Sequence, residues 1–214
     1  MKKIYFVRHG ESEGNVGEYS QGASVPLTEK GRKQANCVAE RLREIPIDLI
    51  LASTNDRARD TAHIINETLK KPLENSELLV ERRKPSAMLN VRFDDKESKE
   101  ISKTIWDNFH VPGWRHSNEE NFDDLKQRAL EVFKILEERP EQNILVVTHG
   151  FFLRILIAYL FFGKDMTGKE CRAFALRAHM ENTGICIFGH DMSRMDSPWW
   201  LWTWNDHAHL EDFK

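Results

Sequence analysis

The feature that most constrains the fold of this chain is a series of short, continuous apolar runs separated by segments of helical periodicity. The runs lie at residues 4–7, 48–52, 143–147 and 184–188. Apolar runs of this length, without polar alternation, are typical of strands buried on both faces of a parallel sheet. The Trp-rich segment 199–204 is expected to add a final strand, either amphipathic or buried. Strands that alternate with helices predict an α/β class with a three-layer α/β/α architecture, a mostly parallel central sheet and helices on both faces.

Three of the expected helices begin at residues that are suited to capping. Thr28 is a candidate N-cap for a helix whose apolar residues recur at three- and four-residue spacing. Ser117, followed three residues later by Glu120, fits the capping-box pattern ahead of a second periodic segment. Thr167 and Glu170 fit the same pattern. These helices would connect the strands and cover the sheet.

With 214 residues, the chain suits one domain with a proper core, and we expect a single domain over 1–214. The stretch at about 82–118 is polar with weak periodicity, and we interpret it as an insertion beside the active site. At least one of Arg82, Arg83 and Lys84 is expected near the substrate entrance. The 31 basic and 34 acidic residues give a formal net charge of −3, so no overall basic field favours a nucleic-acid partner. Any anion must be recognised by a local cluster.

The cysteines and the apolar segments bear on location. Cys37, Cys171 and Cys186 are an odd number without metal-type spacing, and we expect buried free thiols in a reducing compartment. The N-terminal apolar run is too short for a signal peptide. The longest apolar stretch, 151–162, contains Arg154 and is shorter than the roughly 20 residues that span a bilayer. The sequence therefore predicts a cytoplasmic protein without a membrane partner.

Polar and basic residues follow three of the expected strands. Just past the strand ends lie Arg8-His9-Gly10, the segment 53–57 with Arg57, and Thr148-His149-Gly150. Ligands of such sheets bind beyond the carboxyl ends of the strands, so these residues are expected to converge. Arginine can hold two phosphate oxygens at once, and the glycines let the backbone amides of Gly10 and Gly150 approach a ligand. The pattern favours phosphoryl transfer, and the chain lacks the Gly-rich nucleotide loop with a following lysine.

Two histidines in an arginine-rich pocket can take different roles. A neutral imidazole can attack phosphorus, while the other, protonated, stabilises the anionic transition state. A carboxylic acid must also move protons, and the segment 77–81 offers Glu77 and Glu81 as candidates. His207 and His209 lie two residues apart, but no third ligand is evident, so we expect neither a metal nor a cofactor.

The order of these motifs resembles a known family. Arg-His-Gly-Glu-Ser at 8–12, followed by Asn15, is similar to the opening motif of the histidine phosphatase superfamily, in the branch that contains cofactor-dependent phosphoglycerate mutase. The segment 26–31 looks like the start of its first helix, 53–62 like its second arginine motif, and 148–150 like its second histidine. Four motifs in this order extend over almost the full chain. The resemblance implies the family's α/β fold and its chemistry.

The resemblance also implies roles for individual residues. It assigns the phosphohistidine nucleophile to His9 and proton transfer to Glu81. Gln21 and Gly22 fall where the substrate-contact loop of the family lies, while Ser12 could either donate to the phosphate or cap the turn. The residues implied to hold the phosphoryl group are Arg8, Asn15, Arg57 and His149.

We therefore expect a phosphatase that hydrolyses a phosphate monoester through a phosphohistidine at His9, most like the broad-specificity phosphatases of the family. One alternative is a mutase, although the chain reads Arg-Arg-Lys-Pro-Ser at 82–86 where mutases carry a Gly- and Trp-containing stretch. The other is a phospho-ligand binding module without catalysis. The expected partner is a small-molecule phosphate ester, and the sequence leaves its identity and the oligomeric state open.

Overall fold

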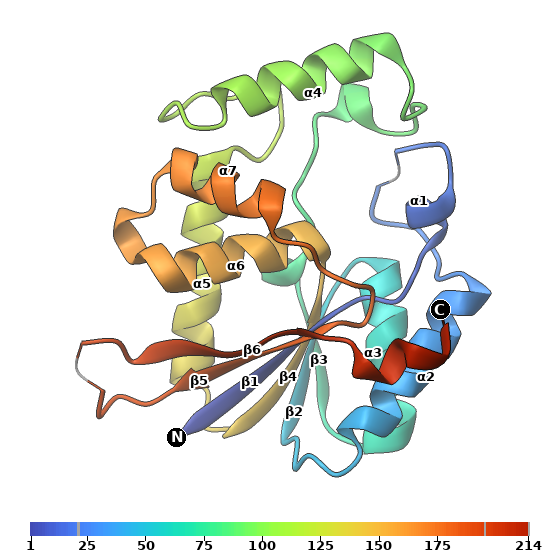
Figure 1. The fold of residues 1–214 in the computed structure, drawn as a ribbon, viewed down its shortest axis with the longest axis vertical. Coiled ribbons are helices and arrows are strands. Elements are labelled where there is room, and N and C mark those ends of the chain that lie inside the picture. Colours follow the sequence, from blue (N-terminus) through green and yellow to red (C-terminus); the bar gives the residue numbers. More distant parts are fainter. Residues whose placement is uncertain (21, 195, 214) are drawn as a thin grey trace.

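A six-stranded sheet forms the centre of the molecule in a computed structural model that describes residues 1–20, 22–194 and 196–213 (Figure 1). Its order is β3-β2-β4-β1-β5-β6. The strands are β1 (Lys2–Arg8), β2 (Leu49–Ser53), β3 (Leu73–Ser76), β4 (Asn143–Thr148), β5 (Ile185–His190) and β6 (Trp199–Asp206). The strand pairs β1–β4, β2–β4 and β2–β3 are parallel, and β5 is antiparallel to its two neighbours, β1 and β6. The expected α/β fold with a mostly parallel sheet is confirmed.

Helices cover both faces of this sheet. The larger ones are α2 (Glu29–Leu42), α3 (Asp56–Leu69), α5 (Phe122–Glu138), α6 (Gly150–Phe162) and α7 (Gly168–Arg177). Successive side chains of a strand point to opposite faces, so Ile4 and Phe6 pack into the core under α5 and α6, whereas Tyr5 and Val7 pack under α2 and α3. The continuous apolar runs in the sequence therefore reflect burial on both faces.

Two of the predicted helix starts are confirmed. The Thr28 side chain accepts a hydrogen bond from the backbone N–H of Gly31 at 3.0 Å and caps α2. Thr167 and Glu170 form a reciprocal capping box at the start of α7. Each cap satisfies backbone donors that have no partner within the first helical turn.

The predicted capping box of Ser117 and Glu120 is wrong. α5 starts later, with Asn121 as its N-cap and Asp124 as the reciprocal partner. Ser117 lies in a turn with φ of 56°, and the Glu120 carboxylate is buried against the Arg128 guanidinium. A buried carboxylate requires a charged or hydrogen-bonding partner, and this requirement overrides the local capping pattern.

The segment at 82–118 contains a helix that the sequence did not predict. α4 (Lys96–Asn108) begins at Asp95, whose side chain accepts from the backbone N–H of Ser98. Figure 1 shows α4 at the top of the molecule, beyond the carboxyl ends of the strands. On this placement we retain the prediction that the segment is an insertion beside the site. The short elements are α1 (Glu13–Val16), η1 (Glu77–Leu79), η2 (Ser86–Met88), η3 (Gly163–Asp165) and η4 (Ala208–Phe213).

The structure confirms the predicted burial for two of the three cysteines. Cys171 and Cys186 are buried, and burial raises the pKa of each thiol to about 12. Cys37 on α2 is only partly buried, so the prediction of burial is wrong for this residue. Within the part of the chain that the structure describes, no helix is both long enough and apolar enough to cross a membrane.

Candidate active site

The carboxyl ends of β1, β2 and β4 meet at one edge of the sheet and bring the predicted residues together. His9 follows β1 and His149 follows β4, and the centroids of their rings lie 5.1 Å apart. His9 lies in the wall of a cavity of about 1020 Å³. Other predicted residues that line this cavity are Arg8, Asn15, Gly22, Arg57, Glu81 and Gly150. Gln21 lies outside the described residues.

The His9 imidazole is held in one tautomer. Its Nδ1 lies 2.7 Å from the carbonyl oxygen of Gly10, which can only accept, so Nδ1 carries the proton. Its Nε2 then has a free lone pair and accepts from Nε of Arg57 at 3.2 Å. Burial, followed by the nearby His149, Arg57 and Arg8, holds the pKa of His9 well below its usual value. The ring is therefore a neutral imidazole whose Nε2 can act as a nucleophile.

His149 lies against His9 and is fully buried. Its Nε2 lies 2.8 Å from the Ser53 hydroxyl, whereas its Nδ1 has no hydrogen-bond partner among the residues that the structure describes. Burial, together with nearby arginines, also holds the pKa of His149 well below its usual value. A buried polar atom without a partner marks a position at which a polar ligand atom can bind, but His149 itself is not among the described residues that line the cavity.

Two arginines contribute positive charge at the base of the cavity. Arg8 donates from Nη1 to the carbonyl of Met180 at 2.5 Å, and Arg57 donates from Nη1 to the carbonyl of Gly22 at 3.2 Å. Burial lowers the pKa of both guanidinium groups, which nevertheless stay charged at neutral pH. A Cβ at Gly150 would lie 3.0 Å from Nε of Arg8, so glycine permits this close approach between α6 and the guanidinium.

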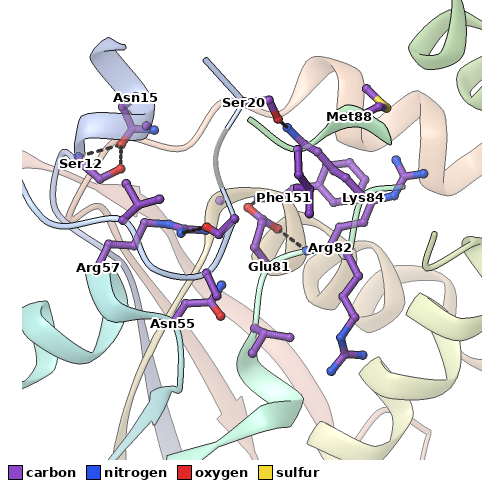
Figure 2. Close-up of a pocket in the computed structure, with 18 of the residues that line it drawn as sticks. Ser12, Asn15, Ser20, Asn55, Arg57, Glu81, Arg82, Lys84, Met88 and Phe151 are labelled. Carbon is purple, nitrogen blue, oxygen red and sulfur yellow. Dashed lines mark hydrogen bonds between the residues drawn. The ribbon is translucent and has the colours of Figure 1, made fainter. Parts of the chain in front are cut away.

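Asn15 presents its amide nitrogen to the same cavity (Figure 2). Its Oδ1 accepts from the Ser12 backbone N–H at 3.1 Å, from the Ser12 hydroxyl at 3.2 Å and from Nδ2 of Asn182 at 3.3 Å. Because Oδ1 is occupied, the Nδ2 group is the part of the side chain available to an anion. The Ser12 hydroxyl thus donates to the Asn15 side chain, and Ser12 itself also lines the cavity. Asn182 also donates to the His9 carbonyl at 2.9 Å and links the two segments.

Glu81 faces the cavity from the side opposite Asn15 (Figure 2). Its carboxylate accepts from the backbone N–H groups of Phe151 at 3.1 Å and Phe152 at 3.0 Å, in the first turn of α6. A carboxylate at a helix N-terminus is stabilised by the helix dipole. Glu77, the alternative candidate, is exposed and bonded to the Thr54 hydroxyl at 2.6 Å. Of the two carboxylates, Glu81 is the one whose charge acts on both Arg8 and Arg57.

The three basic residues that begin the insertion have different partners. Arg82 pairs with the buried Glu119, and Arg83 lies 3.6 Å from Glu77. Lys84 instead donates from Nζ to the Ser20 hydroxyl at 3.1 Å, across the mouth of the cavity (Figure 2). All three residues line the cavity, and Lys84 is the one that bonds to the segment on the other side of it.

Arg154 is a cavity residue that the sequence analysis did not assign. It lies on α6, one turn after Gly150, and donates to the carbonyls of Gly150 at 3.1 Å and Ala175 at 2.5 Å. In the sequence it merely interrupts an apolar stretch. A single charged residue in an otherwise apolar helical stretch is a signal that could have identified it, because charged residues are rarely buried without a partner.

The outer wall of the cavity contributes several large apolar side chains. It is formed by the insertion together with α6 and the segment before β5. The apolar residues of this wall are Met88, Leu89, Phe93, Ile105, Trp106, Phe151 and Met180. The same wall also contains the basic residues Arg82, Arg83, Lys84 and Lys99, so the cavity has a cationic base that suits a phosphate and a mixed outer wall that can contact the rest of an ester.

Comparison with known proteins gives consistent matches over most of the chain. Residues 4–206 match the histidine phosphatase superfamily (branch 1). The adenosylcobalamin/alpha-ribazole phosphatase of Salmonella typhimurium is 35% identical over 164 residues, which cover 74% of this chain and 79% of that protein. The probable phosphoglycerate mutase GpmB of Erwinia tasmaniensis is 29% identical over 99% of this chain and 96% of its own. The structure of Bacillus stearothermophilus YhfR is similar with a TM-score of 0.81 at 28% identity, covering 99% of this chain and all of that one.

Proposed function

This chain belongs to branch 1 of the histidine phosphatase superfamily, and we propose that it hydrolyses a phosphate monoester through a covalent phosphohistidine at His9. The observation that carries the proposal is the state of His9. Its neutral ring has a lone pair on Nε2, which is bonded to Arg57 at the base of a cationic cavity. The cavity volume of about 1020 Å³ and the apolar side chains on its outer wall favour a small-molecule ester as the substrate.

The first step forms the phosphoenzyme. Nε2 of His9 attacks phosphorus in line with the ester bond. The Nε–H group of Arg57, which donates a hydrogen bond to Nε2 in the free protein, then donates to a phosphoryl oxygen instead. The bond from phosphorus to the ester oxygen breaks while the carboxylic acid of Glu81 protonates that oxygen, and the alcohol leaves. Charge on the transferring group is stabilised by Arg8, Arg57, Asn15 and His149.

The second step returns the enzyme to its starting state. The Glu81 carboxylate accepts a proton from water, which attacks phosphorus and breaks the bond between phosphorus and Nε2 of His9. Orthophosphate leaves, His9 is again neutral and Glu81 is again an acid. The sum of both steps consumes one ester and one water and produces one alcohol and one phosphate.

Trapping the phosphoenzyme tests this mechanism. A ³²P-labelled monoester is mixed with enzyme and quenched in alkali, in which phosphohistidine persists, and the label should be released on acidification. The His9→Ala variant should carry no label and lose at least about 10⁴-fold in rate, since removing a nucleophile costs this much or more. A His9→Ala rate within about tenfold of wild type would refute the mechanism. Normal binding of inorganic phosphate without labelling or turnover would favour a non-catalytic binding module.

A mutase is the second candidate, because a probable phosphoglycerate mutase is similar to this chain over 99% of its length. Such an enzyme returns the phosphoryl group from the histidine to another hydroxyl of the product. Incubation with 3-phosphoglycerate and a trace of bisphosphoglycerate separates the two. We expect free phosphate, and an isomerised phosphoglycerate without phosphate release would favour the mutase.

A further inference from the structure

The geometry points to the buried ion pair of Glu120 and Arg128 as the device that positions Glu81 for proton transfer, and this inference rests on the function proposed above. Nε of Arg128 lies 2.6 Å from Oε1 of Glu120, and Nη2 lies 2.7 Å from Oε2. The two side chains are only 6% and 5% exposed. Neither belongs to the described residues that line the cavity, so their role must be exerted through other groups.

Arg128 holds the backbone immediately before Glu81. Its Nη1 donates to the carbonyl of Leu78 at 3.0 Å and to the carbonyl of Val80 at 2.7 Å. The carbonyl between them, that of Leu79, accepts from the Thr148 hydroxyl at 2.7 Å. Three consecutive carbonyls are thus fixed by side chains from α5 and β4, at a place where the chain has already left strand β3.

Glu120 holds the backbone just after Glu81. Its Oε2 accepts from the backbone N–H of Arg83 at 3.2 Å, and its own N–H donates to the carbonyl of Arg83 at 2.9 Å. The same ion pair therefore fixes the chain on both sides of Glu81. Because the segment is held at both ends, the backbone of Glu81 and the position of its carboxylate are restricted.

The ion pair also reaches the groups that bind the Glu81 carboxylate. The central guanidinium carbon of Arg128 lies 3.7 Å from the centroid of the Phe152 ring. The backbone N–H of Phe152 donates to Oε1 of Glu81 at 3.0 Å. Arg128 thus contacts the backbone that carries Glu81 and the residue that orients its carboxylate.

A role in stability alone is a weak explanation for this pair. Removing two charges from water is costly, and an apolar pair of similar volume is often at least as stable as a buried ion pair. What an apolar pair cannot supply is the set of directed hydrogen bonds to the carbonyls of Leu78 and Val80 and to the N–H of Arg83. The positioning of Glu81 requires those bonds.

Two esters with different leaving groups distinguish positioning from general damage. The 4-nitrophenolate group leaves with little need for a proton, whereas the alkoxide of 2-phenylethyl phosphate must be protonated. For the double variant Glu120→Leu/Arg128→Met, kcat/KM should fall about 100-fold with the alkyl ester and less than about threefold with the nitrophenyl ester, the former loss being typical of a displaced catalytic group. Inhibition by inorganic phosphate should be unchanged, because the phosphate-binding residues are untouched.

Three further variants complete the test. Glu81→Gln should show the same ester-selective loss, and Glu74→Leu/Arg139→Met, which removes an ion pair at the far end of the sheet, should show none. Arg128→Lys keeps the charge but loses the bidentate fork, so it should repeat the selective loss even where the double variant fails to fold.

Two results would overturn the inference. One is wild-type kcat/KM with both esters for the Glu120 and Arg128 variants. The other is an equal fall with both esters, which would indicate a structural role. If Glu81→Gln itself showed no ester-selective loss, the proposed proton donor would be wrong, and the positioning role would be rejected with it.

Discussion

Lowering the pH is expected to destabilise the folded protein through His9 and His149. Both imidazoles are buried, and burial together with nearby cations holds their pKa values well below the usual range. In the unfolded chain a histidine has its ordinary pKa of about 6.5. Below about pH 6.5 the unfolded state therefore binds a proton at each site that the folded state does not, and stability falls as the pH falls.

The size of this effect follows from the number of protons. One proton bound only by the unfolded state changes the free energy of unfolding by about 1.4 kcal/mol per pH unit, once that state is mostly protonated. The two histidines together should therefore approach about 2.8 kcal/mol per pH unit below pH 6. Since a domain of this kind is stable by roughly 5–15 kcal/mol, two pH units remove a large share of its stability.

Urea unfolding at pH 7.5, 6.0 and 5.0, in buffers without phosphate, measures the effect. His9→Gln cannot titrate, so its stability should fall less steeply than that of wild type, by about 1.4 kcal/mol per pH unit below pH 6. Replacement of the exposed His63 by Gln is the matched control and should keep the wild-type slope. Equal slopes for His9→Gln and wild type would refute the reasoning, because they would mean that His9 titrates alike in both states.

Two further substitutions test the packing and the charge of the site. Arg57→Lys keeps a cation but loses the bonds to His9 and to the Gly22 carbonyl, and kcat/KM should fall about 100- to 1000-fold with the fold intact. A loss of less than about tenfold in steady-state assays would contradict this role of Arg57. Gly10→Ala would place a Cβ 2.4 Å from the carbonyl oxygen of Gly31, so the backbone must shift. Urea unfolding should show a loss of about 1–3 kcal/mol, and wild-type stability would mean that this approach relaxes freely.

The cationic side of the cavity could be predicted because its residues follow directly from strand ends. Arg8 is the last residue of β1, His9 follows it, and His149 follows β4. Parallel strands bring their carboxyl ends to one edge of a sheet. The short motifs at these strand ends therefore indicated both the chemistry of the site and its place in the fold. The structure brings these side chains together, while their chemical roles stay predictions.

β3 and α4 were not predicted, and the reasons differ. Elements are inferred from the apolar pattern that burial imposes, and these two bury little. β3 is an edge strand in which Leu73 is the one apolar residue, and α4 buries only Ser98 and Ile105. β3 therefore leaves no alternating signal, whereas Ile101, Ile105 and Trp106 recur at helical spacing in α4 and were overlooked within a polar segment.

Glu120 illustrates a different limit, in which a local pattern is present but a distant partner decides. Its spacing from Ser117 matches a capping box, yet the carboxylate pairs with Arg128 on the next helix and holds the N–H of Arg83. The contacts that give Glu120 its importance join segments up to 37 residues apart in the sequence. Such a role follows from the fold and has no signature within a short window.

The base and the outer wall of the cavity come from different parts of the fold. We therefore expect the residues that carry out the reaction to differ from those that select the substrate. His9 and Arg57 are fixed by the ends of buried strands and by the first turn of α3. The opposite wall comes from the insertion, where Leu89 and Phe93 stay 37% and 49% exposed. Peripheral loops tolerate change more readily than the buried elements that position reacting groups. Substitutions on the outer wall should therefore change which ester reacts, whereas substitutions at the strand ends should decide whether any ester reacts.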